Sequence, residues 1–331
     1  MAKTNIIITE PIYQLTQTVD QILFPETKPY NEGYLKVSDI HQIWYGEYGN
    51  PEGVPAVVIH GGPGSLSSLL DMRSLDPSFY RIILFDQRGS GKSIPAAEMT
   101  ENSPAHTIKD MESLRTHLGV DKWVLCGGSF GTTLAIVYGG THADRCLGVI
   151  LRGYIGGQEE REFFWKTGGE RYPEAWHVFA NLIPEAERAN LVEAYYKRLM
   201  DPDPAVHIPF ARAYATYMST HNALINRYYP LLDNDTYVLS ISRTYAHYYT
   251  TKSFFNHDQL LNNVNKINHL PAIFVHGRYD LRVRPKIVYE LHLNWPNSKL
   301  VFVSDAGHVS GEPGILKELV IASEEMKARI K

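Results

Sequence analysis

A single hydroxyl group lies among glycines between residues 127 and 131. Gly127, Gly128 and Gly131 surround Ser129, after an apolar run typical of a buried strand and before a run typical of a helix. Glycine is preferred where the backbone needs a positive φ or passes close to other atoms, so the pattern predicts a tight turn from strand to helix. A G-x-S-x-G sequence at such a turn holds the serine oxygen out at its tip, where it can act as a nucleophile.

A serine hydroxyl becomes a useful nucleophile only when a base removes its proton and a third group orients that base. Two candidates follow Ser129 along the chain. Asp280 comes just after the apolar run 272–277, and His308 just after the run 299–305. The carboxyl ends of neighbouring parallel strands meet at one edge of a sheet, so these side chains are placed to converge. The order Ser, Asp, His is the one found with this type of serine turn.

Acyl transfer also needs N–H donors for the negative oxygen that develops at the attacked carbonyl. The loop HGGPG, residues 60–64, follows the first buried strand and can supply one donor. The backbone N–H of Phe130, the residue after the nucleophile, is predicted to be the second.

Two other chemistries are not supported by the motifs. The stretch GSGKS in residues 89–93 looks like a phosphate-binding loop, but that motif needs glycine five residues before Gly91, where the chain has Asp86. The sequence contains neither H-E-x-x-H nor a pair of C-x-x-C motifs, so we expect no metal site.

Composition restricts the class of protein further. The chain has 331 residues, a net charge of −4, 44% hydrophobic and 21% charged residues, as in a soluble globular protein. This charge predicts neither a nucleic-acid partner nor binding to an anionic membrane. No apolar run approaches 18 residues, and the first residues do not resemble a secretory signal. Cys126 and Cys146 lie in or beside apolar runs, so we expect free thiols and a cytoplasmic location.

Short apolar runs alternate with segments of helical periodicity. This alternation predicts an α/β fold with a mostly parallel central sheet flanked by helices. An antiparallel pair at residues 34–39 and 40–49 is expected to start the sheet. The six runs predicted as buried strands are residues 56–60, 81–86, 122–127, 147–153, 272–277 and 299–305.

The alternation stops after about residue 153 and resumes near residue 271. The segment between has helical patterns and many aromatic residues, which indicates an inserted α-helical cap (lid). We therefore predict an N-terminal arm at residues 1–22, a core formed by residues 23–153 and 271–331, and a cap at residues 154–270. No role is assigned to the arm.

Seven segments in this order resemble the prolyl aminopeptidases (proline iminopeptidases), which are capped serine hydrolases of the α/β-hydrolase superfamily. The resemblance extends from about Leu23 to Gly314, nearly the whole chain. The segments are HGGPG (60–64), DQRGSGKS (86–93), GGSFGTTLAI (127–136), LRG (151–153), PEAERANLVEAYYKRL (184–199), HGRYD (276–280) and DAGH (305–308).

The resemblance implies a role for each candidate. Ser129 is the nucleophile, His308 the general base and then acid, and Asp280 the residue that orients His308. The backbone amides of Gly62 and Phe130 form the oxyanion hole. Enzymes of this family need no cofactor and release an N-terminal proline from short peptides.

The predicted substrate pocket departs from the family pattern. Two cap glutamates of the family bind the free amine of the substrate. Met218 in ARAYATYMS and Tyr245 in SRTYAHYY stand at these positions, whereas Arg152 in LRG matches a family pocket arginine. A buried ammonium without a counter-charge is costly, by about 2–5 kcal/mol for each lost pair. Recognition of a free N-terminus is therefore expected to be weakened.

Three functions follow as hypotheses. The first is a serine hydrolase of the prolyl aminopeptidase type that acts on small peptides. The second is an amidase or esterase whose pocket has been repurposed for an uncharged or acylated small molecule. The third is a non-catalytic binding protein on a hydrolase scaffold, which the complete set Ser129, Asp280 and His308 disfavours.

Overall fold

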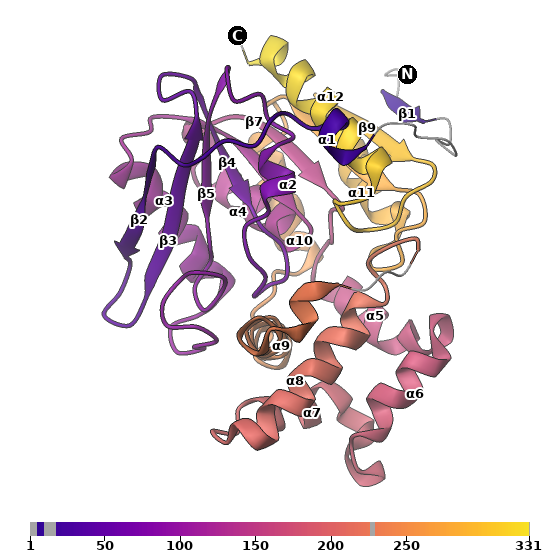
Figure 1. Cartoon of the computed structure of the whole chain (residues 1–331). Helices are drawn as coiled ribbons and strands as arrows, with labels where there is room; N and C mark the ends of the chain where they lie inside the picture. The colour runs from indigo at the N-terminus through magenta and orange to yellow at the C-terminus, as the bar shows by residue number, and fades with distance from the viewer. Residues whose placement is uncertain (1–4, 10–17, 226–228, 331) are drawn as a thin grey trace.

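The centre of the fold is a mixed β-sheet (Figure 1). The computed structural model describes residues 5–9, 18–225 and 229–330, and within them the sheet has nine strands in the order β1-β9-β8-β7-β6-β4-β5-β3-β2. β3 runs antiparallel to β2 and β5, and all other neighbours are parallel. The strands are β1 (Ile6–Ile8), β2 (Asn31–Lys36), β3 (Gln42–Gly49), β4 (Val54–Ile59), β5 (Tyr80–Phe85), β6 (Trp123–Gly128), β7 (Cys146–Arg152), β8 (Ala272–Gly277) and β9 (Ser298–Val303).

Helices cover both faces of the sheet because alternate residues of its strands point to opposite sides. Val57 and Ile59 of β4 belong to the hydrophobic cluster under α3, α4, α10 and α11, whereas Ala56 and Val58 belong to the cluster under α2 and α12. The flanking helices are α1 (Val19–Ile22), α2 (Leu69–Met72), α3 (Pro104–His117), α4 (Phe130–Thr141), α10 (His257–Ile267), α11 (Pro285–Leu293) and α12 (Pro313–Arg329).

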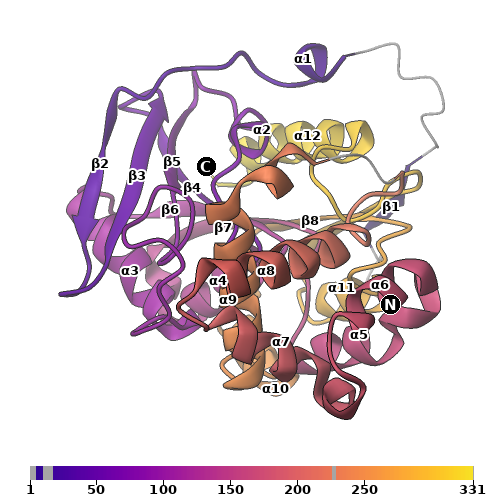
Figure 2. The same cartoon turned by 60° about the horizontal axis from the view of Figure 1, so that its bottom comes forward.

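Five further helices form a separate group on one side of the sheet (Figures 1 and 2). They are α5 (Gln158–Arg171), α6 (Pro173–Asn181), α7 (Leu191–Leu199), α8 (Pro204–Ser219) and α9 (Asp235–Thr250). α7, α8 and α9 pack against one another.

This group of helices contacts the loops that follow the strands. A Cβ on Gly64, in the loop after β4, would lie 2.5 Å from the carbonyl oxygen of Ser240 in α9. The backbone N–H of His308, after β9, donates to the carbonyl of Asn222. The group therefore covers loops that follow the carboxyl ends of the strands.

Most of the predicted elements are confirmed. All six predicted strands are present; 272–277 coincides with β8, and the ends of the other five differ by one or two residues. β2 and β3 form the expected antiparallel pair. Two features were not foreseen. Part of the arm, Ile6–Ile8, pairs in parallel with β9, while residues 1–4 and 10–17 lie outside the described residues. α10, within the segment predicted as cap, packs on α4 beside the sheet. The division into core and cap remains a prediction.

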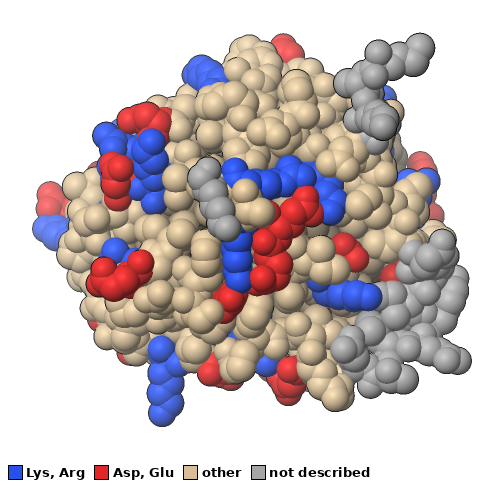
Figure 3. Space-filling model, turned by 90° about the horizontal axis from the view of Figure 1, so that it is seen from above, with Lys and Arg blue, Asp and Glu red and all other residues tan. Residues whose placement is uncertain are grey.

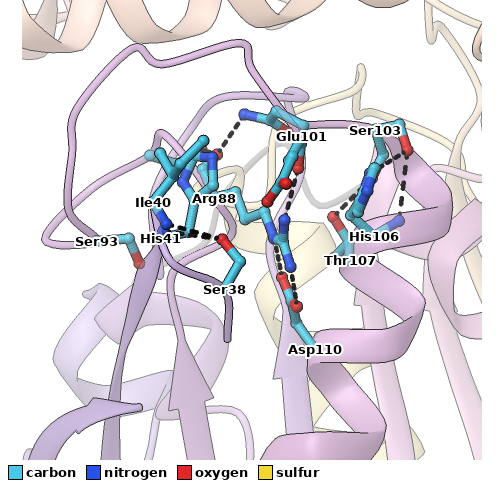
Figure 4. A network of polar contacts seen from close by, with 12 residues as sticks. Ser38, Ile40, His41, Arg88, Ser93, Glu101, Ser103, His106, Thr107 and Asp110 are labelled. Atoms are coloured by element: carbon cyan, nitrogen blue, oxygen red, sulfur yellow. Dashed lines mark hydrogen bonds and ion pairs between the residues drawn. The ribbon is translucent and has the colours of Figure 1, made fainter. Parts of the chain in front are cut away.

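The DQRGSGKS segment is held by buried polar contacts (Figure 4). Arg88 donates two hydrogen bonds to Asp110 of α3, at 2.6 and 2.7 Å, and both side chains are 3% exposed. Its Nη1 also donates to the carbonyl of Glu101. The carboxylate of Asp86 accepts the backbone N–H groups of Ser67 and Lys92. The segment therefore braces the loops after β4 and β5.

Charged residues of both signs are interspersed on the face seen in Figure 3, which carries no extended patch of one sign. This distribution agrees with the small net charge of −4. Among the helices of the described ranges, none combines the length and the apolar character needed to span a membrane.

Candidate active site

Ser129 lies at the tip of a sharp turn between β6 and α4. Its φ of 53° and ψ of −121° are unfavourable for a residue with a side chain. The flanking glycines are needed because the turn is crowded. A Cβ on Gly128 would lie 2.5 Å from Nη2 of Arg152, and a Cβ on Gly131 would overlap the carbonyl of Ile59. The sequence pattern thus reflects a real steric requirement.

Loops after β8 and β9 bring the other two candidates to the serine. Nε2 of His308 lies 2.8 Å from Oγ of Ser129, and Nδ1 of His308 lies 2.6 Å from Oδ2 of Asp280. The second carboxylate oxygen of Asp280 accepts the backbone N–H groups of Arg282 and Val283, at 2.8 and 2.9 Å. The three predicted residues therefore lie in one hydrogen-bonded row.

The electrostatics suit a neutral imidazole beside an ionised carboxylate. Burial lowers the pKa of His308, although the neighbouring Asp280 opposes this shift. Burial would raise the pKa of Asp280, but the charge and hydrogen bond of His308 outweigh it and lower this pKa to about 2. At neutral pH His308 is then free to accept a proton from Ser129.

A second histidine, His276 of β8, was not singled out by the sequence analysis. It is fully buried, and its Nε2 lies 3.7 Å from Oδ2 of Asp280. Burial lowers its pKa, with Asp280 opposing. Its position inside the HGRYD motif was the only available signal.

The predicted oxyanion donors lie next to Ser129. A Cβ on Gly61 would lie 2.8 Å from Cβ of Ser129, so the HGGPG loop passes directly against Ser129. Gly62 lines the same cavity as Ser129, and Phe130 is the first residue of α4. The loop is anchored by His60, whose Nε2 accepts the backbone N–H of Gln87 at 3.0 Å. The donor role of the two amides remains a prediction.

A cavity opens on Ser129. Its lining includes charged residues that the sequence analysis missed, because Glu160 and Arg161 look like solvent-facing residues of a helix. The residues that line the cavity are Gly62, Ser129, Ile155, Glu160, Arg161, Phe164, Tyr245, Arg282 and Val283.

Arg282 occupies the region between the two positions where carboxylates were expected. Its Nη1 donates to the carbonyl of Met218 at 3.1 Å and lies 3.3 Å from the Met218 sulfur. Its guanidinium lies 6.0 Å from the ring centre of Tyr245 and 4.8 Å from that of Phe164. Tyr245 lines the cavity, whereas Met218 is buried just behind it. A cation of the protein itself thus lies beside the two positions that would bind the substrate ammonium in the family pattern.

Arg152 lies behind Ser129 and is not among the residues that line this cavity. Its Nη1 donates to the carbonyl of His308 at 2.8 Å, and its own carbonyl accepts the backbone N–H of Ser129 at 2.8 Å. It lines a second cavity beneath the turn, together with Cys126 and Asp71. The contacts show a positioning role, and the predicted contact of Arg152 with substrate stays a prediction.

Comparisons with known proteins agree with this geometry. The alpha/beta hydrolase fold family matches residues 55–314. A proline iminopeptidase of Arabidopsis thaliana is 42% identical, over 96% of this chain and 86% of that protein. The proline iminopeptidase of Xanthomonas citri is 38% identical, over 91% of this chain and 98% of its own length.

Solved structures of lower identity share the fold. The proline iminopeptidase of Mycobacterium smegmatis superposes with a TM-score of 0.60 at 14% identity, covering 91% of this chain and 99% of that one. An esterase of Exiguobacterium antarcticum gives 0.63 at 18% identity, covering 90% and 100%. A proline iminopeptidase and an esterase thus share this fold, so the fold alone does not distinguish the two activities. The relatives at 38–42% identity are proline iminopeptidases and identify the family. The chain belongs to the proline iminopeptidase family of serine hydrolases with the α/β-hydrolase fold.

Proposed function

We propose that the protein hydrolyses an amide or ester bond of a small substrate by transferring its acyl group to Ser129. The observation that carries this proposal is the hydrogen-bonded row of Ser129, His308 and Asp280, with separations of 2.8 and 2.6 Å. A binding protein has no need for a nucleophile held in strained backbone beside a neutral, buried base.

The reaction has two halves. Oγ of Ser129 attacks the substrate carbonyl while Nε2 of His308 takes its proton, and the amides of Gly62 and Phe130 stabilise the oxyanion. The C–N or C–O bond then breaks as His308 gives the proton to the leaving group. Water attacks the acyl-enzyme with His308 as base again, which releases the acid and restores Ser129.

Two substrate classes are candidates. The names of the curated relatives favour short peptides with an N-terminal proline. The second candidate is an amide or ester without a free amine, and a specific contact favours it. Arg282 lies against Met218 and Tyr245, where the family pattern has glutamates, so a substrate ammonium would meet a guanidinium rather than carboxylates. We favour the second class.

A substrate panel tests the proposal. Purified protein is assayed with prolyl arylamide, N-acetylprolyl arylamide and short-chain 4-nitrophenyl esters, and is labelled with a fluorophosphonate. Ser129→Ala should abolish labelling and turnover. Ser78 is exposed and lies far from Ser129 in the sequence, so Ser78→Ala should change neither. Labelling that persists in Ser129→Ala would refute the assignment of the nucleophile. Fast turnover of prolyl arylamide alone would favour the first substrate class.

We propose a cytoplasmic location and the arm, core and cap division given above. Cys126 and Cys146 are both free thiols, which supports a reducing compartment. The group α5–α9 contributes Glu160, Arg161 and Phe164 to the cavity, which supports a cap that shapes the substrate site.

A further inference from the structure

Two guanidinium groups face the cavity that opens on Ser129. Arg161 comes from α5, and Arg282 comes from the loop after β8 that also carries Asp280. Neither forms an ion pair with a carboxylate in the described part of the chain; each is bonded to backbone carbonyls instead. Positive charges in an enclosed site normally pair with an anionic group, and these two arginines have no such group among the described residues.

Arg161 is the more deeply buried of the two. Its side chain is 4% exposed, its Nη1 donates to the carbonyls of Gly156 and Gly157, and its guanidinium lies 4.0 Å from the ring centre of Phe254. Nε and Nη2 have no hydrogen-bond partner among the described residues. Burial lowers the pKa of Arg161 to about 10, so the group remains charged at neutral pH. This buried cation, a residue of the cavity wall, therefore has two nitrogen donors that no described residue satisfies.

Arg282 is held close to the triad by its main chain, which donates to Asp280. Its side chain is partly exposed and bonded to the Met218 carbonyl, which leaves most of its five donors unused. Phe164 and Tyr245 pack beside its guanidinium and limit its movement. The cation is thus set in place at the wall of the cavity.

The acidic residues nearby do not neutralise these charges. Among the described residues that line the cavity Glu160 is the one carboxylate, and it is bonded to Arg284 through Nε at 3.0 Å and through Nη2. Asp280 is ionised and is hydrogen-bonded to the neutral His308. The three arginines 161, 282 and 284 against Glu160 and Asp280 leave an excess of one positive charge around the cavity.

We propose, on the basis of the acyl transfer at Ser129 proposed above, that the substrate carries a carboxylate in its acyl half and that Arg282 and Arg161 bind it. A carboxylate accepts the paired donors of a guanidinium and supplies the missing counter-charge. The acyl half is the part that stays attached to Ser129 in the intermediate, and the cavity beside Ser129 must hold it. The pocket is therefore specific for an anionic substrate, whereas the second hypothesis from the sequence was an uncharged or acylated small molecule.

The test compares two esters that differ only in charge. They are 4-nitrophenyl hydrogen glutarate and its methyl ester, which have the same leaving group and nearly the same acyl chain. We measure kcat/KM for each and subtract the rate found with Ser129→Ala. Wild type should prefer the free carboxylate by about tenfold to a hundredfold, the range of a charge-assisted hydrogen bond. An equal rate or a preference for the methyl ester would overturn the proposal.

Variants connect the preference to the two arginines. Arg282→Met should reduce the ratio of the two kcat/KM values towards one, and Arg161→Met should also reduce it if that variant folds. Arg278→Met is the matched control, because Arg278 lies on the same loop but is exposed and outside the cavity lining. It should keep the wild-type ratio. A ratio unchanged in Arg282→Met would contradict the assignment.

A binding measurement separates this inference from the proposed function. Glutarate should bind the Ser129→Ala protein in calorimetry, and glutaramide, its neutral counterpart, should bind at least tenfold more weakly. If neither ester is hydrolysed, the acyl transfer is refuted while the glutarate titration still decides whether the cavity takes an anion. Equal binding of glutarate and glutaramide would overturn the anion site even in an active enzyme.

Discussion

The backbone conformation at Ser129 predicts that glycine at this position gives a more stable protein than alanine does. A residue with a β-carbon at φ 53° and ψ −121° carries strain of about 1–3 kcal/mol. Glycine removes this strain but costs about 0.5–1 kcal/mol through its freer unfolded state. Ser129→Gly should therefore exceed Ser129→Ala in the free energy of unfolding by about 1 kcal/mol, or about 1–2 °C in Tm for a chain of this length. Both variants lose the bond to His308 and both are inactive, so their difference isolates the strain.

Guanidinium chloride unfolding, followed by tryptophan fluorescence and supported by thermal scans, measures this difference. The matched control is Ser113, an exposed serine within α3. There the order should reverse, and Ser113→Ala should be more stable than Ser113→Gly by about 1 kcal/mol because alanine favours a helix interior. An alanine variant at Ser129 as stable as the glycine variant would show that the turn stores no strain.

Three further predictions concern protonation, a buried ion pair and the turn. The proposed general base, His308, must be unprotonated, and burial lowers its pKa. The value of kcat/KM should therefore decline with falling pH only below about 6.5. A midpoint of this decline above 6.5 would contradict a neutral His308. Asp110→Ala leaves Arg88 buried without its partner and should cost about 3–5 kcal/mol in urea unfolding, whereas Arg88→Met with Asp110→Leu should cost less. A methyl group in Gly128→Ala would clash with the guanidinium of Arg152, which donates a hydrogen bond to the His308 carbonyl. This substitution should lower kcat by about a hundredfold, with a smaller change in KM.

The elements that carry Ser129, Asp280 and His308 were predictable because their constraints are local. The glycines around Ser129 are required by atoms a few residues away, and the strands that carry Asp280 and His308 are continuous apolar runs. The sequence also led to the prediction that Met218 and Tyr245 stand where the family has carboxylates.

The charge of the substrate site was not predictable, since it depends on burial that only the folded chain determines. Arg161 follows two glutamates in a helix, a pattern typical of a solvent-facing surface, yet it is 4% exposed. Arg282 stands two residues beyond Asp280, and nothing in that spacing indicates that its side chain reaches Met218. That no carboxylate of the described residues pairs with either arginine is a property of the three-dimensional site alone.

The pairing of β1 with β9 has a consequence for how the molecule behaves at high concentration. β9 has six residues, and β1 covers three of them, from Leu300 to Phe302. A strand of three residues offers few free N–H and C=O groups to a neighbouring molecule, so it ends the sheet without giving a template for edge-to-edge association. Removal of residues 1–8 would uncover the outer side of β9 and promote aggregation of otherwise folded protein.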